Sequence, residues 1–176
     1  MIINNVTHYT PDIIIPNETI FAKYGITNEK IISKGEIKQR RLTQFDENTN
    51  SMTIKAVTKA LPDLPFPINE IDLIIGATYT PYEIGGKLAS AVQKQNNIGE
   101  ARCFTLDSAC SSFVNAIEIV DRYFANNKTS KALIVISENN TAYIDESDKN
   151  SCFLLGKYMQ FETEQILNKN DLILVN

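Results

Sequence analysis

Residues 103–126 read CFTLDSACSSFVNAIEIVDRYFAN, a stretch that joins an apolar segment, a turn of small residues and an amphipathic helical pattern. The apolar segment Cys103–Asp107 is short and predicts a strand. From Ser111 to Asn126, apolar side chains recur every three or four positions, which is typical of a helix with one buried face. Only Ser108, Ala109 and Cys110 separate the two patterns. The stretch therefore predicts a strand that turns sharply into a helix.

Two more apolar segments extend this pattern on either side. Residues Ile71–Thr78 and Lys131–Ser137 are rich in Ile, Leu and Val, and each predicts a strand buried on both faces. A helical pattern covers Lys87–Gln95, and another opens at Asn50 or Ser51 before Pro62 ends it. Strands that alternate with helices predict an α/β fold with a mixed, mostly parallel sheet and helices packed on it.

The first 45 residues carry weaker patterns. We expect an opening strand at Ile2–His8, followed by a loop with Pro11 and Pro16. A helix at Glu18–Tyr24, capped by Asn17, should come next, and then a helix from Thr27 to near Lys34. The segment Ile37–Phe45 is basic and is expected to be irregular.

Composition excludes several classes of protein. The chain has 176 residues and a net charge of −4, so no basic excess favours nucleic acid. His8 is the single histidine, which excludes a metal site built on paired histidines within one chain. Cys103, Cys110 and Cys152 form no Cys-x-x-Cys pair. We expect no metal and no resident cofactor. With no signal peptide or membrane-length apolar run in the sequence, we expect a cytoplasmic protein without a membrane partner.

Cys110 is the candidate catalytic residue. A turn from strand to helix places a side chain at the helix N-terminus, where peptide dipoles and free N–H groups favour a thiolate and a developing oxyanion. The alternative is a small buried hydrophobe, which free cysteines often are. Cys103 and Cys152 lie in apolar runs, and we interpret both as structural thiols.

The segment Asp107–Phe113 resembles the nucleophile segment of the beta-ketoacyl-ACP synthase III family, which has a thiolase-like fold. The resemblance continues, in family order, through Lys34–Leu42, Asp46–Asn48, Ile71–Pro81, Ala132–Glu138 and Phe153–Gly156. It covers about residues 1–156, as the N-terminal, nucleophile half of the family. Residues 157–176 form a divergent C-terminal tail, and the half that carries the family's His and Asn is absent from the match.

The resemblance implies that Cys110 takes an acyl group from a coenzyme A or acyl carrier protein thioester. The acyl group then condenses with a malonyl thioester that loses carbon dioxide, as in fatty acid or polyketide synthesis. Arg40, beside Lys38 and Arg41, could bind a phosphate of the coenzyme or carrier arm, or could belong to a solvated basic loop. Gly85 and Gly86 replace a Phe-Pro of the acyl-pocket wall, which implies a larger pocket, or they simply form a loop.

Three further features complete the comparison with the family. Lys30 stands where the family has a Trp that stacks on adenine. After Gly156 the family's Gly-Asp-Gly-Ala does not follow. The acidic residues Glu138 and Asp145–Asp148 receive no chemical role. The chain is then either an acyltransferase or a truncated, non-catalytic thiolase-fold subunit or fragment that acts as an interaction partner. In both cases we expect a homodimer or a heteromer with a full-length synthase.

Overall fold

The computed structural model describes residues 1–21, 27, 29, 36–85, 87–126 and 128–143. The chain divides into two units. The first consists of Met1–Asp12 and Thr43–Asn140, and the second of Ile13–Leu42 and Thr141–Asn176. The candidate nucleophile belongs to the first unit.

A parallel sheet of three strands forms the centre of the first unit. The strand order is β4 (Arg102–Leu106), β3 (Leu73–Ala77) and β5 (Ala132–Ile136). Both neighbours run parallel to β3, with Ala77 opposite Leu106 on one side and Ile136 on the other. Every residue of β3 is buried, as its continuous apolar sequence predicts. All three strands predicted from residues 71–137 are confirmed, but β5 lies at an edge of the sheet and only its Val135 is buried, so the expected burial of this strand on both faces was wrong.

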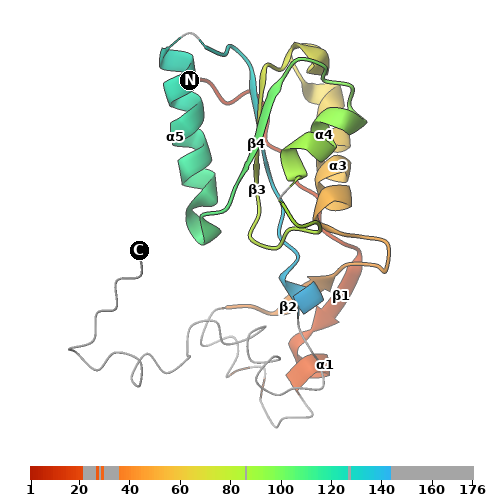
Figure 1. The fold of residues 1–176 in the computed structure, drawn as a ribbon. Helices are drawn as coiled ribbons and strands as arrows, with labels where there is room; N and C mark the ends of the chain where they lie inside the picture. The colour runs from red at the N-terminus through yellow and green to blue at the C-terminus, as the bar shows by residue number, and fades with distance from the viewer. Residues whose placement is uncertain (22–26, 28, 30–35, 86, 127, 144–176) are drawn as a thin grey trace, which may run out of the picture. The chain divides into compact units, whose positions relative to one another are not determined.

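Helices cover both faces of this sheet (Figure 1). One face carries α5 (Ser112–Ala125), and the other carries α3 (Thr49–Ala60) and α4 (Leu88–Gln95). The predicted α/β architecture is therefore confirmed. The residues that fill the core are Leu73, Ile75, Ala116 and Val120 beneath α5, and Ile71, Ile74, Val57, Ala89, Leu88, Val92 and Val135 on the other face.

Gly76 lets α4 approach the central strand closely. A Cβ atom at this position would lie 2.8 Å from the Ala89 backbone nitrogen and 3.1 Å from Thr105 Oγ1. The same Ala89 N–H donates a hydrogen bond to Thr105 Oγ1 at 3.4 Å. Only a residue without a side chain fits between β3 and the start of α4.

Helix α3 begins one or two residues before its predicted opening at Asn50 or Ser51. The helix begins at Thr49, and its cap is Asn48 rather than Asn50 or Ser51. Asn48 and Ser51 form a reciprocal capping box, with Ser51 N donating to Asn48 Oδ1 at 3.0 Å and Asn48 N donating to Ser51 Oγ at 2.9 Å. The predicted helix is confirmed, and its boundary is corrected by this cap.

The second unit contains an antiparallel pair that the sequence analysis missed. Strand β1 (Ile13–Pro16) pairs with β2 (Gln39–Leu42), with Ile13 opposite Leu42. The expected loop around Pro16 and the expected irregular segment at Ile37–Phe45 were therefore wrong over these residues. Each strand is short, and its hydrogen bonds come from a segment far away in sequence, so no local pattern reveals it. Asn17 opens the short helix α1 (Asn17–Phe21).

The expected opening strand at Ile2–His8 was also wrong. No strand forms within residues 1–12 of the described chain, and Ile2, Ile3 and Val6 are exposed. Several expectations lie wholly or partly outside the described residues: residues 22–24 of the first expected helix, most of the helix from Thr27 to near Lys34, Lys30, Gly86, the acidic run at 145–148, Cys152, the matched segment at 153–156 and the tail at 157–176.

Candidate active site

Cys110 lies in the connection between β4 and α5. After β4 ends at Leu106, residues Ala109–Ser111 form a 3₁₀ turn and α5 begins at Ser112. The Cys110 side chain is exposed, so the alternative of a buried small hydrophobe does not fit. Ala109, directly before it, has a φ of 46°, a left-handed conformation that is rare and strained for a residue with a side chain. The predicted sharp turn from strand to helix is confirmed.

Side chains hold this turn at both ends. Asp107 Oδ1 accepts a hydrogen bond from Ala109 N at 3.3 Å. Ser112 Oγ accepts one from Ser108 N at 3.0 Å, and Ser112 is buried at the first turn of α5. Small polar residues around Cys110 therefore fix the backbone while the thiol stays open to solvent.

Two further turns meet Cys110's turn at the same edge of the sheet. Beyond β3, Thr78 N donates to the carbonyl oxygen of Leu106 at 3.2 Å, and beyond β5, Ser137 N donates to the carbonyl of Ala77 at 3.2 Å. Because the strands are parallel, all three carboxyl ends face one way. In open α/β sheets this edge is where ligands bind.

Glu138 organises the turn that follows β3. Its carboxylate accepts hydrogen bonds from Tyr79 N at 3.1 Å, Thr80 N at 3.2 Å, Thr80 Oγ1 at 2.7 Å and Thr78 Oγ1 at 3.4 Å. The Thr80 hydroxyl also accepts from Asn139 N at 2.8 Å. Thr78, Thr80 and Asn139 are buried. Glu138 received no chemical role from the sequence, because the residues that it binds lie 58 to 60 positions earlier in the chain.

The loop carrying Gly85 leaves this turn toward α4. Tyr82 N donates to Thr49 Oγ1 at 3.1 Å, which anchors the loop to the start of α3. Gly85 has a φ of +93°, and nothing lies within 4 Å of where its Cβ would be. Its backbone conformation accounts for a glycine here. Its predicted place in an acyl pocket stays a prediction.

Arg40 lies in β2 of the second unit and is partly buried. Its guanidinium donates to Asn17 Oδ1, and Asn17 Nδ2 donates to the carbonyl of Ile37 at 2.7 Å. Burial lowers the pKa of Arg40. Arg40 therefore helps to hold β2 to the buried Asn17. The alternative of a solvated basic loop does not fit this partly buried strand residue. Its predicted phosphate contact stays a prediction.

Neither Cys103 nor His8 lies in the turn that carries Cys110. The Cys103 thiol is half-buried, its Sγ lies 4.0 Å from the carbonyl oxygen of Ala89, and burial raises its pKa. Such a thiol is a poor nucleophile, as predicted. The backbone oxygen of His8 accepts a hydrogen bond from Lys59 Nζ at 3.3 Å.

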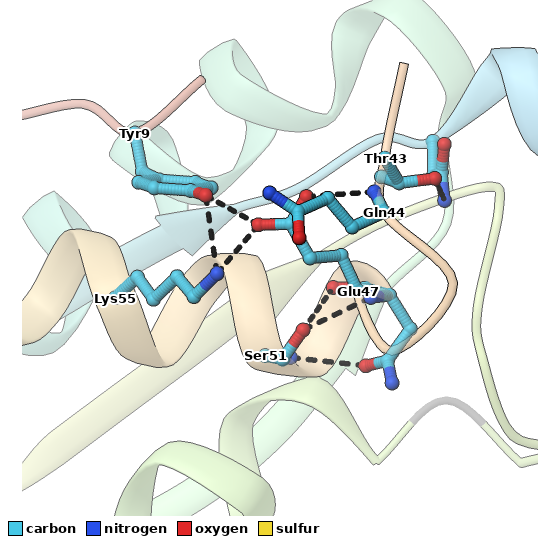
Figure 2. Close-up of polar contacts among 8 residues, drawn as sticks. Tyr9, Thr43, Gln44, Glu47, Ser51 and Lys55 are labelled. Atoms are coloured by element: carbon cyan, nitrogen blue, oxygen red, sulfur yellow. Dashed lines mark hydrogen bonds and ion pairs between the residues drawn. The ribbon is translucent and has the colours of Figure 1, made fainter. Parts of the chain in front are cut away.

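Glu47 forms a separate polar cluster, shown in Figure 2. Its carboxylate accepts hydrogen bonds from Lys55 Nζ at 2.5 Å, from the Tyr9 hydroxyl and from Gln44 N at 2.9 Å. The hydrogen bonds from Lys55 and Tyr9 lower the pKa of Glu47 to about 2. This cluster ties the N-terminal segment to α3.

No described residues form a group of three or more histidine, cysteine or acidic side chains arranged to hold a metal ion. Among the helices that the structure describes, none combines the length and apolar character needed to cross a bilayer.

Comparison with known proteins connects this edge of the sheet to a family. The family model of 3-oxoacyl-[acyl-carrier-protein (ACP)] synthase III matches residues 104–157, which include Cys110, α5 and β5. The beta-ketoacyl-[acyl-carrier-protein] synthase III of Clostridium botulinum (strain 657 / Type Ba4) is 34% identical over 148 residues, which are 84% of this chain and 45% of that protein. Over these residues the chain is similar to the synthase III family. The Prochlorococcus marinus (strain MIT 9301) synthase III is 31% identical over 84% of this chain and 44% of its own length.

Solved structures show the same thiolase-like fold. The synthase III of Aquifex aeolicus VF5 matches with a TM-score of 0.74 and 28% identity, over 84% of this chain and 49% of that chain. The priming beta-ketosynthase of the R1128 polyketide biosynthetic pathway matches with a TM-score of 0.74 and 26% identity, over 81% and 43%. The resemblance and fold class predicted from sequence are confirmed. The chain spans about half the length of the relatives it matches.

Proposed function

We propose that Cys110 is the acyl-accepting nucleophile of a 3-oxoacyl-ACP synthase III-type acyltransferase. One observation carries the proposal. The exposed thiol of Cys110 follows the strained Ala109 at the start of α5, inside the residues matched by the synthase III model. A strained turn that presents a nucleophile at the carboxyl edge of a sheet is a recurrent arrangement for acyl transfer.

The first step follows from this geometry. The Cys110 thiolate attacks the carbonyl carbon of an acyl thioester, and the carbon–sulfur bond to the donor breaks. The acyl group stays on Cys110 Sγ, and the donor leaves as a thiolate that takes a proton from solvent. The peptide dipoles at the start of α5 favour negative charge on the oxyanion of the intermediate. Coenzyme A or acyl carrier protein thioesters are the proposed donors.

The second step would join this acyl group to a malonyl thioester, with loss of carbon dioxide and return of the Cys110 thiolate. The product is a 3-oxoacyl carrier-protein thioester. The family resemblance assigns this step to a His and an Asn that the matched residues do not contain. His8 lies in the N-terminal segment, with its carbonyl bound by Lys59. We therefore expect acylation by the chain itself, and condensation only in the presence of a full-length synthase that supplies the His and the Asn.

A second candidate function is that of a non-catalytic subunit. Phe113 is 51% exposed and Val114 is 65% exposed in the first turn of α5, beside the site. Exposed large apolar side chains of this kind are frequent at protein interfaces. A chain that binds a full-length synthase through this surface, and accepts no acyl group, would fit the same structure.

Incubation with acyl-CoA and acyl carrier protein thioesters, followed by intact-mass measurement, separates the two functions. We expect the chain to gain the mass of one acyl group, Cys110→Ala to gain none, and Cys103→Ala to gain as much as the native chain. Donors from acetyl upward also test the prediction that Gly85 and Gly86 leave room for acyl groups longer than acetyl. A native chain that stays at its starting mass would favour the non-catalytic subunit.

A further inference from the structure

The turn at Thr78–Thr80 is built more tightly than a surface connection needs. The Glu138 carboxylate accepts from two backbone N–H groups and two hydroxyl groups of this turn, at 2.7 to 3.4 Å. The Thr80 hydroxyl in turn accepts a hydrogen bond from the backbone N–H of Asn139. The Thr80 hydroxyl is therefore bonded both to the Glu138 carboxylate and to the backbone of the next residue. A charged acceptor forms stronger hydrogen bonds than a neutral one.

The same turn is bonded to the strand that leads to Cys110. Thr78 offers its hydroxyl to Glu138 at 3.4 Å and its backbone N–H to the Leu106 carbonyl at 3.2 Å. Leu106 is the last residue of β4, and Asp107 after it accepts from Ala109 N at 3.3 Å. A continuous series of bonds therefore runs from Glu138 to the residue before Cys110.

The turn also begins the loop that carries Gly85. Glu138 fixes the backbone of Tyr79 and Thr80, and Thr49 fixes Tyr82 two residues later. A shift of the turn at Thr80 would thus move the start of this loop as well as the end of β4.

We infer that Glu138 is a positioning residue for the Cys110 site. Its carboxylate holds the Thr78–Thr80 turn in place, and through that turn it sets the position of the Cys110 thiol and of the loop that begins at Pro81. The inference rests on the proposed function for its reaction and assigns Glu138 no contact with the acyl group. Displacement of a reacting group by about 1 Å lowers rates by up to about a hundredfold.

Four variants isolate this role. Glu138→Gln keeps the size of the side chain but replaces an acceptor oxygen by an NH₂ group that cannot accept from a backbone N–H. Thr80→Val keeps the shape and loses the hydroxyl, whereas Thr80→Ser keeps the hydroxyl. Asp72→Asn makes the same chemical change as Glu138→Gln at the opposite end of β3, where Asp72 holds Ser130 and Lys131.

Two rates are measured on each protein at a temperature where circular dichroism shows it fully folded. The first is the maximal rate of Cys110 acylation at saturating acyl-CoA. The second is the rate of Cys110 alkylation by iodoacetamide, followed by peptide mapping. For Glu138→Gln and Thr80→Val we expect acylation to slow about tenfold or more. Their alkylation should slow roughly two- to fivefold, because the thiol is no longer held at the helix start. Thr80→Ser and Asp72→Asn should match the native chain in both.

The outcomes keep the two proposals apart. A native chain that accepts no acyl group overturns the proposed function, and the alkylation rates still decide the role of Glu138. If Glu138→Gln and Thr80→Val match Asp72→Asn in alkylation, Glu138 only stabilises the fold and the inference is wrong. If Glu138→Gln fails to fold, the contrast between Thr80→Val and Thr80→Ser decides in the same way.

Discussion

At each end of the parallel sheet, a carboxylate binds the turn of a neighbouring strand. At the amino end, Asp72 before β3 accepts hydrogen bonds from Ser130 N at 2.8 Å and Lys131 N at 3.2 Å, which lead into β5. At the carboxyl end, Glu138 after β5 accepts from the turn that leaves β3. Each carboxylate therefore joins the same two strands by binding the neighbour's turn.

What differs is the chemistry beside each carboxylate. The turn held by Glu138 is bonded to the end of β4, four residues before the exposed thiol of Cys110. The turn held by Asp72 consists of Thr129, Ser130 and Lys131, none of which is a cysteine or histidine. The comparison indicates that an identical hydrogen-bond pattern acts on stability alone at one end and on a reactive group at the other.

The largest loss of stability is expected from a substitution in β3, the strand between the two carboxylates. Gly76→Val would place side-chain atoms against the Ala89 backbone, where a Cβ alone would already lie 2.8 Å away. We expect α4 to move off the sheet and the free energy of unfolding to fall by about 3 kcal/mol or more. Urea unfolding followed by circular dichroism measures the change. An unchanged midpoint would contradict the close packing of α4 on β3.

A smaller effect is expected from Asp72→Ala, which leaves the N–H groups of Ser130 and Lys131 without their acceptor. We expect the free energy of unfolding to fall by about 2 kcal/mol, the usual scale for hydrogen bonds to a charged group. The acylation rate of the folded protein should stay unchanged. A loss of acylation that exceeds the loss of folded protein would erase the difference between the two ends.

The pH dependence of Asp72 sharpens this prediction. Burial raises its pKa, but the hydrogen bonds from Thr129, Ser130 and Lys131 outweigh burial, and the net pKa is lowered from 3.8. The folded state therefore holds its proton less tightly than the unfolded state. The stability that Asp72 contributes is present above pH 3.8 and is lost as the pH falls below it. The difference between the native chain and Asp72→Ala should shrink over that range.

The smallest effect is expected at a third carboxylate, Glu47, which lies outside the sheet. Lys55→Met removes its ion pair, but Lys55 is half-exposed and solvent screens the pair, so we expect only a small loss of stability at pH 7. Because the pKa of Glu47 is lowered from 4.5 to about 2, its contribution should disappear as the pH falls through that range. Unfolding at pH 7 and pH 3 measures this. A difference that grows in acid would contradict the assignment.

The parts predicted from sequence are those whose signal is local. The continuous apolar run of Leu73–Ala77 and the helical period of Ser112–Ala125 depend only on neighbouring residues, and both elements formed as expected. The strand-to-helix turn at Cys110 followed from the same two patterns. The pairing of β1 with β2 did not, because each strand is completed by a segment more than twenty residues away.

The site could be predicted only in part for the same reason. Cys110 is visible as a cysteine between a strand and a helix, but the left-handed backbone of Ala109 depends on how β4 and α5 are joined in space. The role of Glu138 depends on residues 58 to 60 positions earlier in the chain. A stretch of sequence around Glu138 shows only an acidic residue after a strand.

The most direct test of the account is to locate the acyl group among the three cysteines. The native chain is incubated with an acyl-CoA, digested and mapped by mass spectrometry. We expect the acyl group on the peptide that contains Cys110, with Cys103 and Cys152 unmodified. An acyl group found on Cys103, or spread evenly over the three cysteines, would contradict the claim that the carboxyl edge of the sheet is the active site.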